Sequence, residues 1–203
     1  MKTNALKSFE YRQIADDLLK GNVVGFPTET VYGLAIVYDS VDAFTKLYEI
    51  KNRNINKPIS MMVADIETIS SVAYVDEKAK KVINAFMPGP ITIILKAKEN
   101  LPEHVTFKLS TIGIRIPDHQ TALNVLKEVK KPLLVSSANI SNEPSLIKAR
   151  DVKEIFGGKI ASFIEEDAVD GIASTVVDLT TDPIKIYRQG PISEEEILKV
   201  IGE

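Results

Sequence analysis

The chain has 203 residues, 44% of them hydrophobic and 26% charged, which excludes a disordered chain and predicts a globular one with a sizeable core. Lys and Arg number 25 against 28 Asp and Glu, so the formal net charge of -3 excludes a globally basic nucleic-acid binder and leaves only a local basic groove. Cysteine is absent, which excludes disulfides and thiolate sites, and no apolar stretch has the length of a membrane helix or a signal-peptide core, so we expect a cytoplasmic protein with no membrane partner.

The N-terminal part of the chain predicts a helix, a strand and a polar turn. Apolar residues at helical spacing between Ser8, a good N-cap, and Gly21, a frequent helix stop, predict a helix over residues 9–19. Residues 23–26 have the pattern of a buried strand. Residues 26–34, Phe-Pro-Thr-Glu-Thr-Val-Tyr-Gly-Leu, then place three hydroxyls and a carboxylate between a proline and a glycine. This composition is typical of a ligand-binding segment and equally of an ordinary strand-to-loop connection.

Helical and strand patterns are interleaved along the rest of the chain. The expected elements are strand 34–37, helix 41–48 capped by Asp39 or Ser40, strand 59–63, helix 79–86, strand 91–95, strand 112–116, helix 123–129, strand 133–135, helix 152–156, strands 160–164, 175–179 and 184–187, and a helix bearing residues 197–201 behind a Ser193 and Glu196 capping box. This alternation predicts an α/β fold with a largely mixed sheet. No repeat or composition break marks a linker, so we expect a single domain over residues 1–203.

Five polar residues lie where a ligand could be bound. Lys51 and Arg53 stand at i and i+2 in an asparagine-rich loop, so they either converge on a phosphate chain or belong to a solvated loop. Arg115 alternates with isoleucines in a strand, so it points away from their face and would bind an anion if it faces a groove. Ser137 and Asn139 follow a buried strand, which is where α/β sheets tend to bind ligands.

Several common sites are excluded or disfavoured. Neither a phosphate loop of the Gly-x-x-x-x-Gly-Lys-Ser/Thr type nor a Gly-x-Gly-x-x-Gly fingerprint is present. His104 and His119 lack neighbours at metal-ligand spacing, so we expect surface or loop residues rather than a zinc site. Ser137 lacks the Gly-x-Ser-x-Gly setting of a hydrolase nucleophile. The acidic run at residues 165–170 is typical of a solvated edge without a catalytic role.

The order and wording of several segments together resemble one known family. These segments are residues 26–34, Lys51-x-Arg53 with Lys57-Pro58-Ile59-Ser60, Pro88-Gly89-Pro90-Ile91-Thr92, Gly113-Ile114-Arg115-Ile116-Pro117, Ser136-Ser137-Ala138-Asn139-Ile140-Ser141, Ser174-Thr175-Val176-Val177-Asp178 and Arg188-Gln189-Gly190. The chain resembles the YrdC/Sua5 family from about Val23 to Gly190. The resemblance implies a twisted mixed sheet with flanking helices around a concave, positively lined cleft.

The resemblance also implies an activity. Family members are L-threonylcarbamoyladenylate synthases, nucleotidyltransferases that combine L-threonine, bicarbonate or CO2, and ATP, release pyrophosphate, and supply the intermediate for threonylcarbamoylation of adenosine 37 in ANN-reading tRNAs. Mg2+ is expected with ATP, with few protein ligands. The expected partners are these substrates and the downstream tRNA threonylcarbamoyl-transferase proteins. Because the chain stops one helix after Arg188-Gln189-Gly190, it resembles the short, single-domain form.

Site residues carried over by resemblance fall into two groups, with no protein nucleophile and no metal ligand. Those expected to bind ATP are Lys51, Arg53, Ser60, Thr111, Ser137, Asn139, Ser145 and Arg188, and those expected to bind L-threonine are Thr28, Arg115 and Ser174. A second hypothesis is a binding module for double-stranded RNA or tRNA without catalysis, because a concave basic cleft would also suit RNA.

Overall fold

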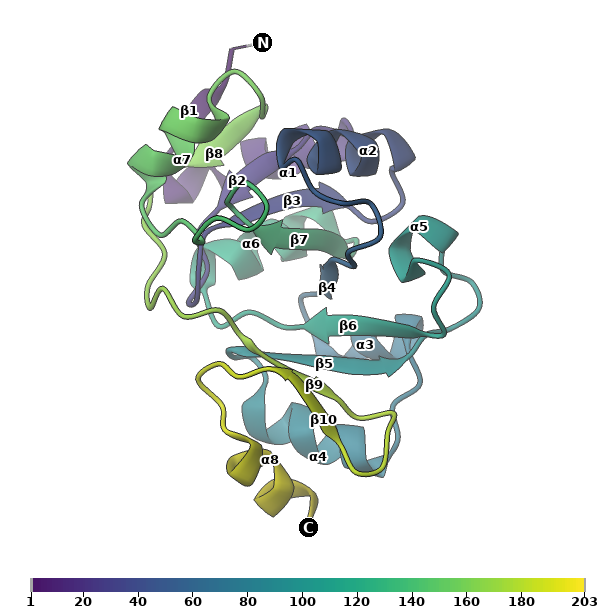
Figure 1. The fold of residues 1–203 in the computed structure, drawn as a ribbon. Coiled ribbons are helices and arrows are strands. Elements are labelled where there is room, and N and C mark those ends of the chain that lie inside the picture. Colours follow the sequence, from purple (N-terminus) through teal and green to yellow (C-terminus); the bar gives the residue numbers. More distant parts are fainter. Residues whose placement is uncertain (1, 203) are drawn as a thin grey trace.

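One ten-stranded mixed sheet runs through the computed structural model, which describes residues 2–202 (Figure 1). Its strands are β1 (Asn4–Leu6), β2 (Val24–Phe26), β3 (Gly33–Val37), β4 (Ser60–Met62), β5 (Ile91–Lys96), β6 (Thr111–Arg115), β7 (Leu133–Ser137), β8 (Ser162–Ile164), β9 (Thr175–Asp178) and β10 (Lys185–Arg188). Their order across the sheet is β1-β8-β2-β3-β7-β4-β6-β5-β9-β10. The sheet contains parallel pairs such as β4 with β6 and antiparallel pairs such as β3 with β7, so the predicted mixed α/β sheet is confirmed.

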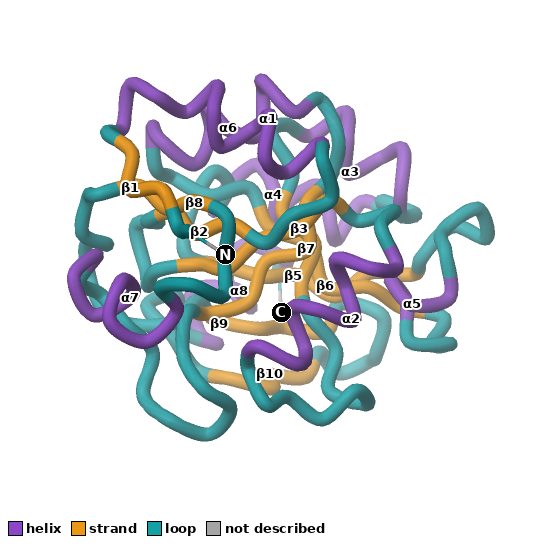
Figure 2. Tube along the Cα trace, turned by 90° about the horizontal axis from the view of Figure 1, so that it is seen from above, coloured by secondary structure: helices purple, strands orange, loops and turns teal. Residues whose placement is uncertain are grey.

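Helices flank this sheet on both sides. They are α1 (Tyr11–Leu19), α2 (Val41–Ile50), α3 (Ile66–Val72), α4 (Glu77–Phe86), α5 (Glu103–Thr106), α6 (Gln120–Val129), α7 (Ala149–Phe156) and α8 (Glu194–Ile201), with a short 3-10 helix at Ser8–Glu10. Seen from above, α1, α3 and α6 lie along one side of the sheet, and α2, α5 and α7 lie on the other (Figure 2). No helix among residues 2–202 combines the length and the apolar character that crossing a bilayer requires.

The period-2 pattern of β3 explains how two cores form. Ala35 and Val37 join the cluster beneath α1 and α6, whereas Leu34 and Ile36 join the larger cluster that includes α2. Successive strand side chains point to opposite faces, so this fully buried strand is covered on both. A strand buried on both faces reads as a continuous apolar run, which is why residues 34–37 carried a strand signal without alternation.

The predicted N-cap residues are confirmed for α2 and α8 but not for α1. The Ser40 side chain accepts from the Ala43 N–H at 3.3 Å, and Ser193 forms the predicted capping box of α8. Ser8, in contrast, begins the 3-10 helix, and the N-cap of α1 is Glu10 without a side-chain cap bond, so the predicted serine cap is wrong. The 3-10 turn separates Ser8 from the α-helical amide groups that it was expected to cap.

Strand ends and adjoining turns bring the polar segments together near the middle of the sheet. The start of β4, the carboxyl ends of β6 and β7, the residue before β9 and the end of β10 all contribute. The turn between β2 and β3 closes this arrangement. It is fixed from outside by a short ribbon in which the amides of Val169, Asp170 and Gly171 donate to the carbonyls of residues 28, 29 and 30 at 3.2, 3.1 and 2.7 Å.

Candidate functional site

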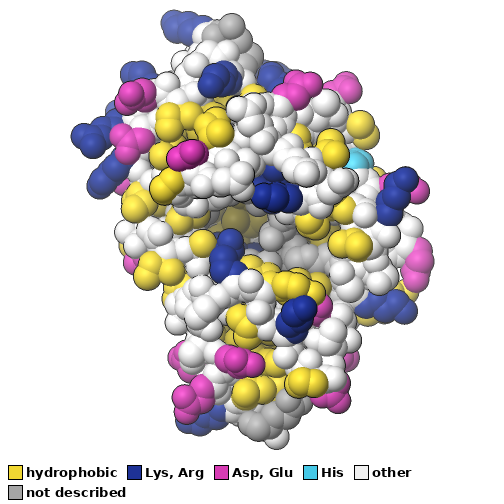
Figure 3. Space-filling view, viewed as in Figure 1, with side chains coloured by type: hydrophobic (Ala, Val, Ile, Leu, Met, Phe, Trp, Pro, Cys, Tyr) yellow, Lys and Arg dark blue, Asp and Glu magenta, His cyan; other side chains and the backbone are white. Residues whose placement is uncertain are grey.

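A cavity of about 320 Å3 lies where these strand ends meet. Figure 3 shows a hollow near the middle of this face with Lys and Arg side chains around it. Its wall includes Arg53, Arg115 and Arg188, which come from three segments far apart in the sequence. A concave site with a few convergent polar groups is the usual form of a small-ligand site. The cavity therefore is the candidate functional site, and it is positively charged within an acidic chain.

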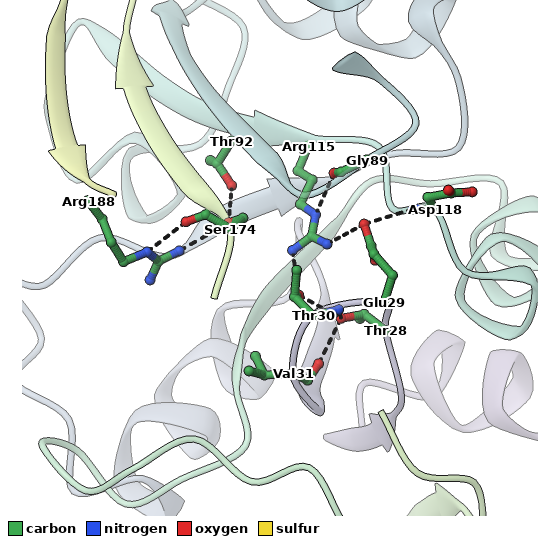
Figure 4. A network of polar contacts seen from close by, with 10 residues as sticks. All are labelled: Thr28, Glu29, Thr30, Val31, Gly89, Thr92, Arg115, Asp118, Ser174 and Arg188. Carbon is green, nitrogen blue, oxygen red and sulfur yellow. Dashed lines mark hydrogen bonds and ion pairs between the residues drawn. The ribbon is translucent and has the colours of Figure 1, made fainter. Parts of the chain in front are cut away.

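Arg115 lies at the end of β6 with its side chain only 8% exposed. Its Nε donates to the Gly89 carbonyl at 3.2 Å, its Nη1 donates to Thr30 Oγ1 at 3.0 Å, and its Nη2 lies 2.5 Å from Glu29 Oε1 (Figure 4). Glu29 Oε1 also accepts from the Asp118 N–H at 2.9 Å. The buried guanidinium thus has a counterion behind it and one side on the cavity, as the alternation of β6 predicts.

Thr28 and Thr30 form a compact hydroxyl turn on the cavity wall. The Thr28 hydroxyl donates to the Val31 carbonyl at 2.7 Å and accepts from the Thr30 N–H at 3.2 Å, and the two hydroxyl oxygens are 2.9 Å apart. Both residues are buried. Thr28, expected to contact L-threonine, lines the cavity, but its hydroxyl is occupied by groups of its own turn.

Arg188 and Ser174 form a second network on the opposite wall. Arg188 Nε donates to the Ser174 carbonyl at 2.8 Å and Nη2 donates to Ser174 Oγ at 3.0 Å, while Thr92 Oγ1 lies 2.9 Å from the same serine oxygen (Figure 4). The pairing of β10 with β9 shifts register between Ile186 and Arg188. Such irregularities re-aim side chains next to sites. Burial, and then the charge of Arg115, lower the pKa of Arg188.

Arg53 and Ser60 line the cavity from the polar loop before β4 and from β4 itself. Arg53 Nη2 donates to the Pro58 carbonyl at 2.9 Å, and its guanidinium carbon lies 5.9 Å from the ring centre of Tyr48. These contacts hold the arginine against its own loop. The loop is tied to its neighbour because Lys57 Nζ donates to Asn142 Oδ1 at 3.0 Å.

Lys51 takes a different position from Arg53. It is 0% exposed and lies outside the cavity wall, with Nζ donating to the carbonyl of Ser137 and to the carbonyl and Oδ1 of Asn139, the latter two at 2.6 and 3.1 Å. Ser137 Oγ donates to the same Asn139 Oδ1 at 2.6 Å. Burial, and then the charge of Arg53, lower the pKa of Lys51 to about 7. Ser137 lines the cavity, and Lys51 and Asn139 stand behind it.

Thr111 and Ser145 are the remaining expected ATP contacts, and both are half-buried outside the cavity wall. Thr111 begins β6, on the same strand face as Gly113 and Arg115, and pairs with Lys96 of β5. Ser145 lies in the loop between β7 and α7. The structure therefore brings together Thr28, Arg53, Ser60, Arg115, Ser137, Ser174 and Arg188 around the cavity, and places Lys51, Thr111, Asn139 and Ser145 outside its wall.

Sequence reasoning missed Thr30, Thr92 and Glu29. Thr30 and Thr92 line the cavity, and Glu29 supports Arg115. All three lie inside segments that carried the family resemblance. Their roles depend on which groups the fold places opposite them, and the sequence pattern shows no such pairing.

The two histidines and the acidic run lie outside the cavity wall. His104 lies half-buried in α5 with its Nε2 2.8 Å from the Tyr38 carbonyl, so the expected surface or loop position is wrong for it, whereas His119 lies in the loop before α6 as expected, with its side chain 9% exposed. The acidic run is an edge as predicted, and Glu165 and Asp167 pair with lysines there. Within residues 2–202, no group of three His, Cys, Asp or Glu side chains could hold a metal ion.

Comparisons with known proteins give consistent results. A family model for Sua5, YciO and YrdC proteins, described as telomere recombination, matches residues 16–190. The chain is 36% identical over 200 residues to the threonylcarbamoyl-AMP synthase of Pyrococcus abyssi, covering 98% of this chain and 59% of that protein. The corresponding synthase of Bacillus subtilis is 39% identical over 193 residues, with 94% and 56% coverage. The crystal structure of P. abyssi Sua5 complexed with L-threonine matches with a TM-score of 0.93 and 35% identity, covering 100% of this chain and 62% of that one. The chain thus spans about three fifths of the length of these relatives.

Proposed function

Because the chain belongs to the Sua5/YciO/YrdC family, we propose that it is a threonylcarbamoyl-AMP synthase, a nucleotidyltransferase acting on L-threonine, bicarbonate or CO2, and ATP. The observation that carries this proposal is the cavity with Arg115 on one wall and Arg188 with Ser174 on the other. Two separated cationic walls suit a reaction that joins two anionic reactants, an amino-acid carboxylate and a polyphosphate. The structure of a relative with L-threonine supports the same assignment.

The proposed reaction has two steps and needs no protein nucleophile. The neutral amine of L-threonine attacks CO2 and loses a proton, which gives an N-carboxylate. One oxygen of this carbamate attacks the α-phosphorus of ATP, the bond to the β-phosphate oxygen breaks, and pyrophosphate leaves. The protein then contributes orientation and charge stabilisation, which can supply several kcal/mol when reacting groups are held close together.

The side chains divide between the two substrates. Arg115 would pair with the threonine carboxylate with Thr28 on the same wall, and Ser174 would contact L-threonine from the opposite wall, where it also holds Arg188. Arg53 and Arg188 would bind the phosphates, with Ser60 and Ser137 as hydroxyl partners. Lys51 and Asn139 would support the phosphate site from behind, because Lys51 holds the chain that carries Ser137. Thr111 and Ser145 lie outside the cavity wall, so they would contact ATP only if the segments that carry them moved toward the cavity.

Mg2+ would accompany ATP as part of the substrate. No Asp or Glu is among the described residues that line the cavity, and the Glu29 carboxylate is already paired with Arg115 (Figure 4). The residues present therefore fit a metal held by the phosphates and water better than one held by the protein. The cytoplasm is the proposed location, and tRNA threonylcarbamoyl-transferase proteins are the proposed consumers of the reactive product.

Pyrophosphate release, measured while ATP, L-threonine or bicarbonate is omitted in turn, tests this function. We expect release only when all three are present, and threonylcarbamoyl-AMP as a second product by mass spectrometry. Release that continues without L-threonine would contradict the synthase. No turnover, together with tRNA affinity that falls steeply with salt, would instead support the RNA-binding module.

A further inference from the structure

We propose that Thr30 is a positioning residue that fixes the orientation of the Arg115 guanidinium through a one-way chain of hydrogen bonds. This proposal rests on the proposed function for its effect on L-threonine, and on the geometry alone for its effect on Arg115. It assigns to Thr30, rather than to the neighbouring Thr28, the hydroxyl that Arg115 depends on.

The direction of each hydrogen bond in this chain follows from the chemistry of its ends. Arg115 Nη1 can only donate, so Thr30 Oγ1 accepts at that contact. The Val31 carbonyl can only accept, so the single Thr28 hydroxyl proton is used there. At the contact between Thr28 and Thr30 the proton must therefore come from Thr30. The order is Arg115 to Thr30 to Thr28 to Val31.

This order leaves Thr28 without spare hydrogen-bonding capacity. Its hydroxyl oxygen already accepts from the Thr30 hydroxyl and from the Thr30 N–H, and its proton is donated to Val31. A hydroxyl has one proton and two lone pairs, so all are used. Thr28 can meet a ligand with its methyl group, but its hydroxyl serves to orient Thr30.

Thr30 sets the rotation of the guanidinium because the other contacts of Arg115 do not suffice. Glu29 Oε1 lies 2.5 Å from Nη2 and supplies the countercharge, but this contact departs from good hydrogen-bond geometry and so fixes the plane only weakly. Gly89 accepts only from Nε. One further directional bond is needed to fix the plane, and Thr30 supplies it. Arg115, held in this plane, lines the cavity and can present its guanidinium to a carboxylate there.

The backbone around Thr30 is held firmly enough for this role. Its carbonyl accepts from the Gly171 N–H at 2.7 Å, in the ribbon of residues 169–171. Gly171 has a φ of +77°, and a Cβ there would lie 2.6 Å from Ile147 Cδ1. A side chain at this position would be strained by the backbone conformation and would displace Ile147, so the ribbon requires glycine here, and its hydrogen bonds fix the turn that presents Thr30 to Arg115.

Binding of L-threonine and of ATP to Thr30→Val, Thr30→Ser and Thr121→Val, measured by calorimetry, tests the proposal. Valine keeps the shape of threonine and removes the hydroxyl, so we expect the Kd for L-threonine to rise about tenfold and the Kd for ATP to stay unchanged. Serine should restore L-threonine binding. Thr121 is equally buried and donates to Glu166 outside the cavity wall, so Thr121→Val controls for the loss of a buried hydroxyl.

A second measurement does not depend on the ligand. The Arg115 Nε–H signal in 15N NMR, identified by its loss in Arg115→Lys, should exchange with water faster in Thr30→Val and at the normal rate in Thr30→Ser. Should Thr30→Val fail to fold, Thr30→Ala, which cannot clash, takes its place. Unchanged exchange would overturn the positioning role. If the unmutated protein does not bind L-threonine and exchange is still faster in Thr30→Val, the proposed function is overturned and the positioning role of Thr30 stands.

Discussion

At the scale of single residues, two of the three arginines that line the cavity, Arg115 and Arg188, are held by different partners. Arg115 pairs with the carboxylate of Glu29, whereas within residues 2–202 Arg188 is held only by Ser174, through its carbonyl and its hydroxyl. A charge that already has a buried counterion binds an added anion less strongly than one held only by neutral groups. This difference favours Arg188 for the phosphates and Arg115 for the single carboxylate of an amino acid.

Arg115→Lys should weaken L-threonine binding by about tenfold or more and leave ATP binding intact. Lysine keeps the charge but cannot reach Gly89, Thr30 and a ligand at once with the planar fork that arginine offers. Separate calorimetric titrations of the two ligands measure the effect. A selective rise in the Kd for ATP would show that the two pockets are exchanged.

Arg53→Ala should lower pyrophosphate release by about 100-fold, as loss of one preorganised donor commonly does. Arg53 is the cation of the polar loop that lines the cavity, and its contacts within the loop are to the carbonyls of Lys57 and Pro58. Arg150→Ala, which removes an exposed arginine on α7, serves as the control and should keep full activity. Retained activity in Arg53→Ala would move the phosphate site elsewhere.

Lys51 should titrate near neutrality, since burial and the charge of Arg53 lower its pKa from 10.5 to about 7. Between these values the unfolded chain binds more protons than the folded one, so folding stability should rise with pH through this window. The difference in denaturant midpoint between the unmutated chain and Lys51→Met, followed from pH 7 to pH 10, measures it. The three oxygen acceptors oppose the shift by favouring the ammonium, and a difference that does not change with pH would show that they prevail.

At the scale of elements, the segment around Gly190 crosses the start of β9 next to Ser174. This crossing positions the cavity wall that Arg188 and Ser174 form. Gly190 packs so closely against β9 that a Cβ would lie 2.3 Å from the Thr175 N atom and 2.4 Å from the Ala173 carbonyl oxygen. Thr175 Oγ1 accepts from the amides of Gly190 and Ile192 at 3.0 and 3.1 Å. Ser174 lies next to this crossing, just before β9, and Arg188 lies two positions before Gly190 at the end of β10. The crossing therefore sets where both residues lie.

Gly190→Ala should therefore lower stability by about 1–3 kcal/mol, as overpacking does, and weaken ATP binding, because β10 must move away from β9 to admit the methyl group. Thermal unfolding and ATP titration together measure this. Ser193→Ala is the matched control, since it removes the α8 cap at a cost of about 1 kcal/mol and lies beyond the crossing. Equal loss of stability with equal ATP affinity in both variants would contradict a positioning role for the crossing.

The sequence predicted the elements whose signals are local. Periodicity and caps located α1, α2, α4, α6, α7, α8 and every strand from β2 onward to within a few residues. It missed β1, which has three residues and depends on pairing with β8, and it missed α3 and α5, which are short. Strand order is set by pairings between distant segments, which no local pattern contains.

The site was predictable to a similar extent. Arg115 could be placed on one strand face from alternation alone, and the family resemblance supplied most of the wall. The burial of Lys51 could not be predicted, because it depends on carbonyl groups that β7 brings to it from residues 137 and 139. A lysine in a polar, asparagine-rich loop is expected to be solvated, because the sequence does not show which buried groups would accept its hydrogen bonds.

At the scale of the whole molecule, the charge distribution favours a small anionic ligand over a nucleic acid. Three arginines line the cavity of a chain whose net charge is -3. RNA binding draws on a broad basic surface that contacts many phosphates, whereas an enclosed cavity concentrates its charge on one ligand. The cavity also joins the two halves of the sheet, because β3 and β7 lie on one side of it and β9 and β10 on the other.

A ligand that contacts both halves should stabilise the fold as a whole. At 100 times its Kd, a ligand that binds only the folded state adds about 2.7 kcal/mol, which for a chain of this size raises Tm by about 5–10 °C. We expect L-threonine and ATP each to raise Tm, with Arg115→Lys reducing the L-threonine increment alone, to about half for a tenfold rise in Kd, and Arg53→Ala reducing the ATP increment alone. Arg150→Ala should keep both increments. If either variant lost both, the two substrates would share one subsite, and the division of the cavity between an Arg115 wall and a phosphate wall would have to be abandoned.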